Sequence, residues 1–481
     1  MVIAMDAADP DLVRAWAAAG ELPAVRRMLD GGTAATVVAP PGVFVTSNWA
    51  SITTGVGPDL HRYLCWDEID PVTYEHRETD PNPETVVGTQ LWAHLDRAGR
   101  RSAMIDVPHT WPAPVDGVMV VEWGCHDRHR GTRSWPPELI GELDDLTGGH
   151  LGEAHHPDRE QFAPCDYVHR ADPIRTLDEE LRLIDDLRVA VERKRQASLH
   201  LLDRGGWDVF WTVLGESHCV GHQLWHHHDP DHPRHDPAAL AAFGVDPVLD
   251  IYRRVDSVIG DHLDRLGPDD TAYLLLPHGM VAHHDGTHLL DPVLANLERS
   301  LDEPDLFGRA TRLASLATSP LPVAARRRAG RLAAPLVRRR LATAPAEEHG
   351  AVPPIAERRW FAAPNNTVSG GVRLNLAGRE GAGRVHPGAR DEVLHWLVDR
   401  LLELVNVDTG GPVVAEVVIA DDVYERRPDD LMPDLFVEWA RTDPIERVWS
   451  PATGTVVRPY GHWRTGDHVP TGLIVAAGPG I

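Results

Sequence analysis

The sequence predicts an α/β protein with a central, mostly parallel sheet between layers of helices. Short apolar runs alternate along the chain with amphipathic stretches, which is typical of parallel strands joined by helices. Apolar runs with the length of buried strands cover residues 2–5, 118–121, 209–214, 272–276, 413–419 and 473–477. Apolar residues spaced three or four apart predict helices over residues 11–19, 177–203, 248–266 and 392–404.

Length and composition indicate a large globular chain. The 481 residues give room for about two to four domains, or for one large enzyme domain with insertions. Hydrophobic residues make up 42% and charged residues 25%, and no apolar run reaches about 18 residues, which excludes membrane-spanning, collagen-like and globally disordered chains. A strand-like run close to the last residue has no covering element after it, so we expect further C-terminal residues to follow.

Acidic residues outnumber basic ones, 72 against 47, which gives a formal net charge of −25. We therefore expect no nucleic-acid-binding surface, and we do not expect the protein surface as a whole to bind anionic membranes. The four cysteines show no CxxC pairing, which argues against a disulfide scaffold or a thiolate zinc finger. The N-terminus lacks a basic segment followed by a long apolar one, so we predict a cytoplasmic location without a secretion signal.

One segment departs from the acidic average. Nine arginines and no acidic residue lie between Gly308 and Pro345, interleaved with alanine and leucine. The segment is either a cationic amphipathic arm for a membrane surface, an anionic partner or the substrate, or a solvated insertion that balances the acidic remainder. We interpret residues 301–357 as an arginine-rich insertion with a possible anionic contact.

Candidate metal ligands follow the predicted strands, where ligands bind in parallel sheets. Asp6 follows the run 2–5, and a carboxylate there needs a metal ion or hydrogen bonds to offset its desolvation. The alternative is that Asp6 caps the next helix, although Asp9 is better placed to do so. His278 follows the run 272–276, and Gly279 permits a tight turn that brings its imidazole inward.

Histidine is abundant, with 28 residues, and much of it is clustered. His218 and His222 are spaced i and i+4, which places both imidazoles on one face of a helix, a common spacing for metal ligands. The histidines from His226 to His235 are predicted to lie in a solvated loop, as polyhistidine runs commonly do. A further cluster occupies residues 283–288.

Six segments, in the same order along the chain, resemble motifs of the alkaline phosphatase superfamily. The segments are Ile-Ala-Met-Asp-Ala-Ala-Asp-Pro at 3–10, Trp-Ala-Ser-Ile-Thr-Thr-Gly-Val-Gly-Pro at 49–58, the stretch around His222, His-Gly-Met at 278–280, Arg-Leu-Asn-Leu-Ala-Gly-Arg-Glu at 373–380 and His-Val-Pro-Thr-Gly at 468–472. Within the superfamily, the chain most resembles the type I phosphodiesterase/nucleotide pyrophosphatase branch. The resemblance implies a central sheet between helices, two metal ions held by Asp and His, and a Thr or Ser nucleophile at a helix N-terminus.

The resemblance also assigns the metal ligands by position. Asp6 and His278 correspond to ligands of one metal ion, and His222 and His468 to ligands of the other. The implied metal is divalent, zinc in the first place with manganese as the alternative.

Two positions depart from the family's pattern. Pro277 stands where the family has an Asp, and it cannot act as a side-chain ligand; Asp285 or His284 would have to replace it, although Asp285 has the alternative role of capping the following helix. His218 stands where the family has another Asp. Because imidazole can replace a carboxylate at zinc, that site can persist as a three-histidine centre, with Glu216 as a second candidate ligand. We therefore expect one tight and one weak metal site.

The position of the nucleophile is ambiguous. Counting back from the motif at 49–58, the family's nucleophile falls on Val45, which cannot attack phosphorus, and the phosphate-contacting Asn falls on Asn48. If the loop is one residue shorter, Thr46 takes the catalytic position, with Ser47 beside it, at a helix N-terminus that would stabilise a phosphoryl group. The alternative is that Thr46 or Ser47 only caps the helix.

A third group of polar residues lies in the segment 373–380. Arg373 and Arg379 can clamp a phosphate or carboxylate in a bidentate manner, and Asn375 lies between them. The family resemblance favours a role close to the substrate or a structural one. The structural alternative is that these arginines pair with Glu380 or other acids.

These observations predict a metal-dependent hydrolase of phosphate esters, acting on a small phosphorylated substrate, more specifically a diester or nucleotide-like ester. The alternative is a relative that has lost turnover and serves as a metal- or ligand-binding scaffold. It is supported by Val45 and Pro277, which stand at the family's nucleophile and metal-ligand positions. Since the motifs are scattered from residue 6 to residue 468, we expect one alkaline phosphatase-like domain over 1–481, with a cap contributed by 62–200.

Overall fold

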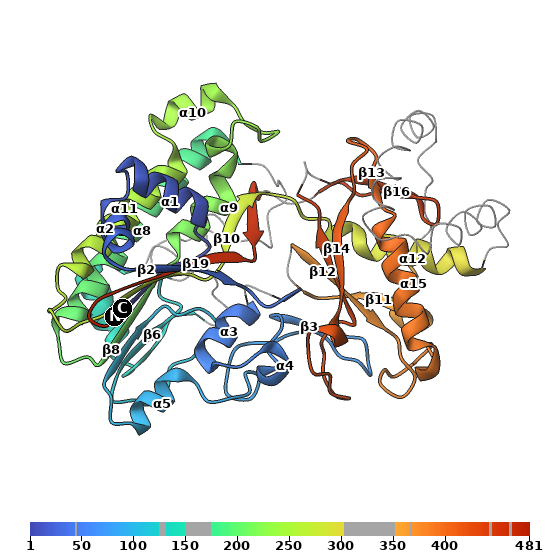
Figure 1. The fold of residues 1–481 in the computed structure, drawn as a ribbon, viewed down its shortest axis with the longest axis horizontal. Coiled ribbons are helices and arrows are strands. Elements are labelled where there is room, and N and C mark those ends of the chain that lie inside the picture. The colour runs from blue at the N-terminus through green and yellow to red at the C-terminus, as the bar shows by residue number, and fades with distance from the viewer. Residues whose placement is uncertain are drawn as a thin grey trace. The chain divides into compact units, whose positions relative to one another are not determined.

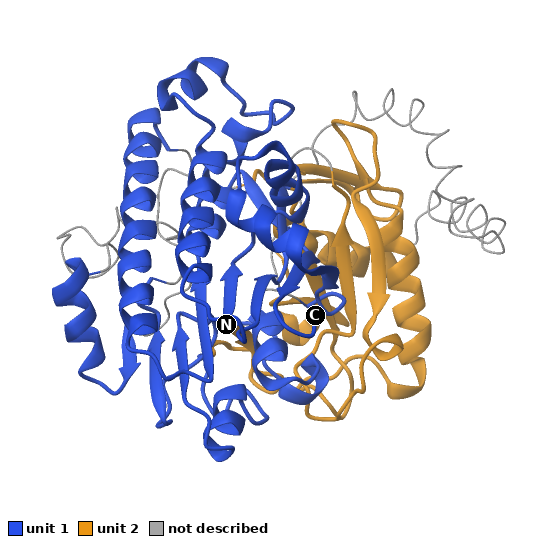
Figure 2. Ribbon diagram, turned by 60° about the vertical axis from the view of Figure 1, so that its left-hand side comes forward, with its two compact units in different colours: residues 1–66, 80–283, 462–481 blue, residues 67–79, 284–461 orange. Residues whose placement is uncertain are grey.

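The computed structural model describes residues 1–43, 46–124, 131–149, 175–302, 352–365, 368–441, 445–460 and 464–481. They form two compact units, shown in different colours in Figure 2. Unit 1 comprises residues 1–66, 80–283 and 462–481, and unit 2 comprises residues 67–79 and 284–461. Val45 and most of the predicted arginine-rich insertion lie outside the described residues.

Unit 1 is built on an eight-stranded sheet with the strand order β2-β19-β9-β1-β8-β5-β6-β7 (Figure 1). The five neighbouring strands from β9 to β6 are parallel, whereas β19 and β7 run in the opposite direction. The strands are β1 (Val2–Met5), β2 (Thr33–Val38), β5 (Ser102–Ile105), β6 (Gly117–Val121), β7 (Arg133–Trp135), β8 (Val209–Leu214), β9 (Ala272–Leu276) and β19 (Thr471–Ala477). Five of the six predicted strands are confirmed in this sheet.

Helices cover both faces of the sheet, as the alternation along β1 requires. Ile3 and Met5 pack into a cluster with residues of several helices, whereas Ala4 packs on the opposite face with Trp49 and Trp92. The helices of unit 1 are α1 (Pro10–Ala19), α2 (Pro23–Gly31), α3 (Thr46–Thr54), α4 (Pro58–His61), α5 (Leu91–Arg97), α6 (Leu139–Thr147), α8 (Leu177–Asp203), α9 (Glu216–His228), α10 (Pro237–Phe243) and α11 (Pro247–Leu263). The predicted helices at 11–19, 177–203 and 248–266 are confirmed as α1, α8 and α11.

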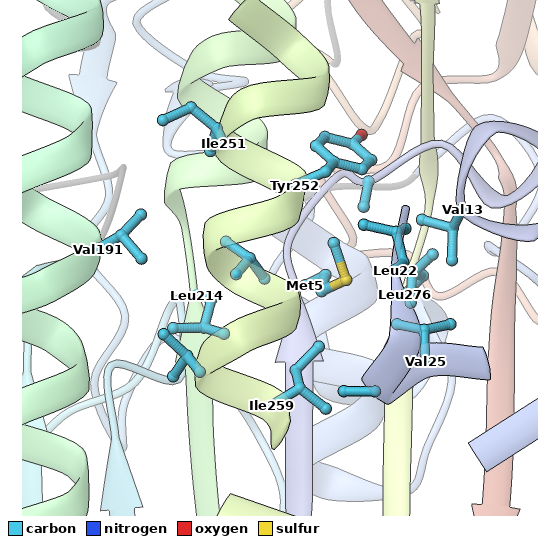
Figure 3. Packing of buried hydrophobic residues seen from close by; sticks show 14 of the residues in the cluster. Met5, Val13, Leu22, Val25, Val191, Leu214, Ile251, Tyr252, Ile259 and Leu276 are labelled. Atoms are coloured by element: carbon cyan, nitrogen blue, oxygen red, sulfur yellow. The ribbon is translucent and has the colours of Figure 1, made fainter. Parts of the chain in front are cut away.

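The largest core cluster of unit 1 joins the sheet to α11. Figure 3 shows Met5, Leu214 and Leu276 from three neighbouring strands together with Ile251 and Ile259 of α11, which belong to the same cluster. All five side chains are buried, and burying each contributes about 1.5–3 kcal/mol relative to leaving it in water. This packing fixes the carboxyl ends of β1, β8 and β9, from which the candidate site residues extend.

The cap assigned to residues 62–200 stays a prediction. Strands β5, β6 and β7 of that range belong to the central sheet, and residues 67–79 belong to unit 2. Unit 1 also contains a two-stranded pair of β10 (Gly279–Ala282) and β18 (Gly466–Val469), which are antiparallel.

Unit 2 contains a four-stranded antiparallel sheet in the order β11-β12-β15-β14. Its apolar face packs on α12 and α15, the latter at the predicted helix 392–404. The elements of unit 2 are β3 (Asp67–Ile69), β4 (His76–Glu78), α12 (Thr287–Asp302), β11 (Trp360–Ala363), β12 (Ser369–Leu374), α15 (Arg390–Leu402), β13 (Val405–Asn406), β14 (Val414–Ile419), β15 (Leu435–Trp439), β16 (Arg447–Ser450) and β17 (Gly454–Val457).

Two expectations about local structure are wrong. The predicted strand 413–419 is β14 of this second sheet and not part of the central one, because an apolar run does not encode its pairing partner. His226 and His227 belong to α9 and are buried, whereas a solvated loop was expected. The His227 ring lies 4.7 Å from that of Phe243 in α10, so packing by a neighbouring helix removes this part of the histidine run from water.

Candidate metal centre

The carboxyl ends of three neighbouring strands bring the predicted ligands together in unit 1. Strand β1 lies between β8 and β9 and is parallel to both. Asp6 follows β1 directly, α9 begins two residues after β8, and His278 lies two residues after β9. Because parallel strands end at the same edge of a sheet, these segments meet there.

Three histidines form the centre of the site, and we call them the histidine centre: His218, His222 and His468. His218 and His222 lie one turn apart on α9, and His468 comes from β18. The Nε2 atom of His218 lies 2.8 Å from that of His222 and 2.9 Å from that of His468. All three side chains are buried, and their arrangement is one that could hold a metal ion.

Gly466 permits the close approach of β18 to α9. A Cβ atom on Gly466 would lie 2.3 Å from the carbonyl oxygen of Gly221, so only glycine fits there. The Thr465 N–H donates to the His222 carbonyl at 2.7 Å and holds the strand against the helix. His468 is thereby placed beside two ligands that lie about 250 positions earlier in the chain.

The hydrogen bonds of the outer ring nitrogens fix which nitrogens face one another. The Nδ1 of His222 lies 2.7 Å from the Gly466 carbonyl oxygen, which only accepts, so Nδ1 carries the proton. The Nδ1 of His218 lies 2.8 Å from Asp6 Oδ2 and donates to that carboxylate. In the neutral rings both Nε2 atoms therefore present lone pairs to each other at 2.8 Å, an arrangement that a cation between them would stabilise.

Asp6 is buried and bridges several groups. Its Oδ2 accepts from His218, and its Oδ1 accepts from Trp49 Nε1 at 3.3 Å and lies 3.9 Å from His278 Nε2. The Ser217 hydroxyl donates to the Asp6 carbonyl at 2.7 Å. The structure thus places Asp6 and His278 side by side, while a role of Asp6 as a direct ligand stays a prediction. The capping alternative belongs to Asp9, whose Oδ1 accepts from Leu12 N–H at 2.7 Å.

The candidate nucleophiles lie at the start of α3. Thr46 is the first residue of the helix, Ser47 the second, and both are buried. Asn48 does not face solvent either: its Nδ2 donates to the Pro277 carbonyl at 3.0 Å. Asn48 therefore connects α3 to the residue that precedes His278, so the helix N-terminus and the carboxyl end of β9 are held together.

The remaining predicted ligands lie elsewhere. Glu216 is the buried first residue of α9, outside the group of three histidines. His284 and Asp285 belong to unit 2, and Asp285 Oδ1 accepts from Thr287 N–H at 2.6 Å where α12 begins, which is the contact expected of a helix cap. Their participation in metal binding stays a prediction.

The residues predicted to bind substrate form a salt-linked network in unit 2. We call Arg373, Arg379, Glu380 and Asp434 the arginine–carboxylate network. Arg373 Nε donates to Glu380 Oε1 at 2.7 Å, and Arg379 donates to both oxygens of Asp434 at 2.8 and 2.6 Å. Burial alone would raise the pKa of Asp434, but hydrogen bonds and charge from Arg379 hold it at about 2.

Asn375 is equally engaged within unit 2. Its Nδ2 donates to the Arg358 carbonyl at 2.9 Å, and its Oδ1 accepts from the Tyr74 hydroxyl at 2.7 Å. These contacts agree with the structural alternative for this segment, and a substrate-binding role for Arg373, Asn375 and Arg379 stays a prediction.

Sequence reasoning missed three contributors to the site. Trp49, Ser217 and Gly466 contact Asp6 or His222 through an indole N–H, a hydroxyl and a backbone carbonyl. Trp49 lies in a segment singled out for its family resemblance, and Ser217 lies beside His218. The role of the Gly466 carbonyl depends on the chain path and had no signal in residue type.

Comparisons with known proteins identify the family and the fold. The model of the family described as type I phosphodiesterase/nucleotide pyrophosphatase matches residues 1–442. The chain belongs to this family. Its fold is the predicted α/β fold of the alkaline phosphatase type. A comparison with curated proteins found no match.

Solved structures of similar fold include phosphonoacetate hydrolase from Sinorhizobium meliloti 1021, in complex with phosphonoacetate or with phosphonoformate. Both structures are 13% identical in sequence to this chain, and the matched regions cover 100% of this chain and 90% of the hydrolase chain. The TM-scores are 0.52 for the phosphonoacetate complex and 0.50 for the phosphonoformate complex. Murine ectonucleotide pyrophosphatase/phosphodiesterase 5 is 11% identical over 99% of this chain and 87% of its own, with a TM-score of 0.42. In the described part of the chain, no helix is long and apolar enough to cross a membrane.

Proposed function

We propose that this protein is a metal-dependent hydrolase of small phosphate esters, with a diester or nucleotide-like ester as substrate. The observation that carries the proposal is the convergence of three buried imidazole nitrogens on one point, with two of the outer nitrogens held by acceptors. Membership of the type I phosphodiesterase/nucleotide pyrophosphatase family supports the chemistry at phosphorus.

The histidine centre has the donor set of a zinc site, and manganese is the alternative metal. Asp6 orients His218 through Nδ1, as carboxylates do for metal-binding histidines. Asp6 Oδ1 and His278 supply the donors of a second, weaker site, because Pro277 provides no side-chain ligand. A divalent ion bound there supplies Lewis-acid stabilisation of the negative charge that develops on phosphoryl oxygens.

Thr46 is the proposed nucleophile. It stands at the N-terminus of α3, where backbone N–H groups without helical partners bind phosphoryl oxygens. The Thr46 oxygen forms a bond to phosphorus while the bond to the leaving oxygen breaks, and water then releases the phosphate from Thr46. Ser47 is the alternative, since its buried hydroxyl has no hydrogen-bond partner among the described atoms. Asn48 holds this turn against Pro277.

Hydrolysis of bis-para-nitrophenyl phosphate tests the proposal. We expect turnover that depends on added zinc or manganese and that is abolished by Asp6→Ala and by His468→Ala. His395→Ala is the matched control, because that histidine is exposed on α15 and its Nδ1 donates to the Asp391 carbonyl in its own helix. This variant should retain the turnover of the natural sequence.

The rival function is a metal- or ligand-binding scaffold without turnover. It is favoured by Pro277, whose carbonyl is already occupied by Asn48 and whose side chain cannot bind metal. Turnover of the natural sequence no greater than that of Asp6→Ala and His468→Ala, with either metal, would establish the scaffold and refute the hydrolase.

A further inference from the structure

A second buried cluster of metal-ligand side chains lies in unit 1, and we call Glu180, His226 and His227 the glutamate–histidine cluster. Glu180 belongs to the first turn of α8, and the two histidines belong to the last turn of α9. The Nε2 of His226 lies 3.3 Å from Glu180 Oε1, and that of His227 lies 2.8 Å from Oε2. The three donor atoms lie within 4.8 Å of one another, and the side chains are at most 6% exposed.

The two helices present these groups to each other because their apolar faces share one core. Leu183 and Leu187 of α8 pack in the same cluster as Val220 and Leu224 of α9. Glu180 is not needed to cap α8, since the Glu179 carboxylate accepts from Thr176 N–H at 2.7 Å in a capping box. The Glu180 carboxylate is therefore directed to the histidines of α9.

Hydrogen bonding does not satisfy this cluster. The Nδ1 atoms of His226 and His227 are buried and have no hydrogen-bond partner among the described atoms. The two rings lie 3.9 Å apart, centre to centre, so protonating both would place two positive charges in contact beside a single carboxylate. By contrast, the nearby His232 has a partner on Nδ1, which accepts from Arg234 N–H at 3.0 Å.

We propose that Glu180, His226 and His227 bind a divalent transition-metal ion of the zinc class, separate from the ion of the histidine centre and from the weaker site at Asp6 and His278. One carboxylate and two imidazoles form a recognised zinc donor set. A single divalent ion bound by all three groups avoids the repulsion between two protonated imidazoles. The ion would fasten the start of α8 to the end of α9. Because α9 also carries His218 and His222, the ion of the glutamate–histidine cluster would stabilise the helix that supplies two ligands of the histidine centre.

Counting zinc in the purified full-length protein tests the site. After dialysis against metal-free buffer, the proteins are analysed by inductively coupled plasma mass spectrometry. We expect Glu180→Gln and His227→Gln each to retain one zinc equivalent fewer than the natural sequence, while hydrolysis of bis-para-nitrophenyl phosphate at saturating zinc stays within about twofold. His228→Gln is the matched control: this histidine is the next residue of the same run and contacts Asp246, so the zinc count should not change.

The same zinc content in Glu180→Gln and the natural sequence would overturn the proposal. A loss of the same equivalent in His228→Gln would also overturn it, because binding would then belong to the histidine run and not to this donor set. If Glu180→Gln does not fold, the readout is thermal melting of His222→Ala, in which the histidine centre is disabled. Added zinc should raise its melting temperature, and no rise would refute the site. Failure of the proposed hydrolase would instead appear as absent turnover with an unchanged zinc count.

Discussion

Two buried polar clusters, one in each compact unit, balance their charges in different ways. In unit 1 the histidine centre gathers three imidazoles whose inner nitrogens lie 2.8 and 2.9 Å apart. In unit 2 the arginine–carboxylate network pairs two guanidinium groups with two carboxylates, and each charge has an opposite partner within 3 Å. The network is complete within the protein, whereas the histidine centre brings together groups of one kind.

The difference bears on which of the two clusters needs a ligand. A buried charge with a hydrogen-bonded partner of opposite sign needs no ligand, although removing either partner is costly. Buried lone pairs that face one another need a cation to offset their repulsion. The sequence predicts metal ligands in the first group and leaves a substrate-binding or a structural role open for the second, and the contacts of the second agree with the structural alternative.

Removal of a ligand from the histidine centre should have the largest effect. His222→Ala takes away one of three nitrogen donors and frees the Gly466 carbonyl. Since loss of an outer-sphere partner already costs 10–100-fold in metal affinity or activity, we expect phosphodiester turnover to fall by more than about 100-fold. Steady-state kinetics at fixed zinc measure this, and a fall of less than about tenfold would show that His222 is not a ligand.

Removal of a carboxylate from the arginine–carboxylate network should reduce the stability of the fold. Asp434→Ala removes one of the two carboxylates that pair with the buried Arg379 guanidinium and leaves it only Glu380, and we expect a loss of about 3–5 kcal/mol in the free energy of unfolding. Asp408→Ala is the control, because its pair with Arg447 is exposed and should contribute within about 1 kcal/mol. Denaturant titrations compare the two. Equal losses would mean that the network does not act as a buried ion pair.

A buried histidine outside both clusters provides the next comparison. His262 donates Nδ1–H to the Val258 carbonyl at 2.8 Å, and burial lowers its pKa to about 4. Unfolding restores a pKa near 6.5, so the unfolded chain binds the additional proton between pH 6.5 and 4. Stability should therefore fall as the pH falls through this window, by up to about 3 kcal/mol from this residue. Denaturant unfolding at several pH values across that range gives the free energy of unfolding as a function of pH. This free energy should depend less steeply on pH in His262→Gln, and the same dependence as in the natural sequence would exclude His262 as the cause.

The smallest expected effect concerns the carboxylate that orients His218. Asp6→Asn retains a hydrogen-bond acceptor for Nδ1 but removes the negative charge. We expect the zinc affinity of the histidine centre to fall by about 10–100-fold, with one equivalent still bound at saturating zinc. Competition with a coloured chelator measures the affinity. Complete loss of that equivalent would identify Asp6 as a direct ligand of the tight ion.

Much of the fold follows from local patterns. The apolar spacing predicts α8 with the bounds that the structure has, and five apolar runs become strands of the central sheet. The i and i+4 spacing of His218 and His222 predicts their shared face on α9. These features depend on neighbours within one turn or one strand, so they can be predicted from residue types and spacing, and the family resemblance added His468.

The burial and the hydrogen-bond partners of polar side chains depend on the tertiary structure. His226 and His227 were expected in a solvated run, yet α8 and α10 bury them. For Arg373 the sequence left a phosphate clamp and a pair with Glu380 as alternatives, and the structure has the pair. The approach of β18 to α9, which brings His468 to the histidine centre, requires a glycine at position 466, where a Cβ atom would lie 2.3 Å from the Gly221 carbonyl oxygen. Hydrogen bonding and burial depend on groups brought together from distant parts of the chain, and the types and spacing of nearby residues do not encode that placement.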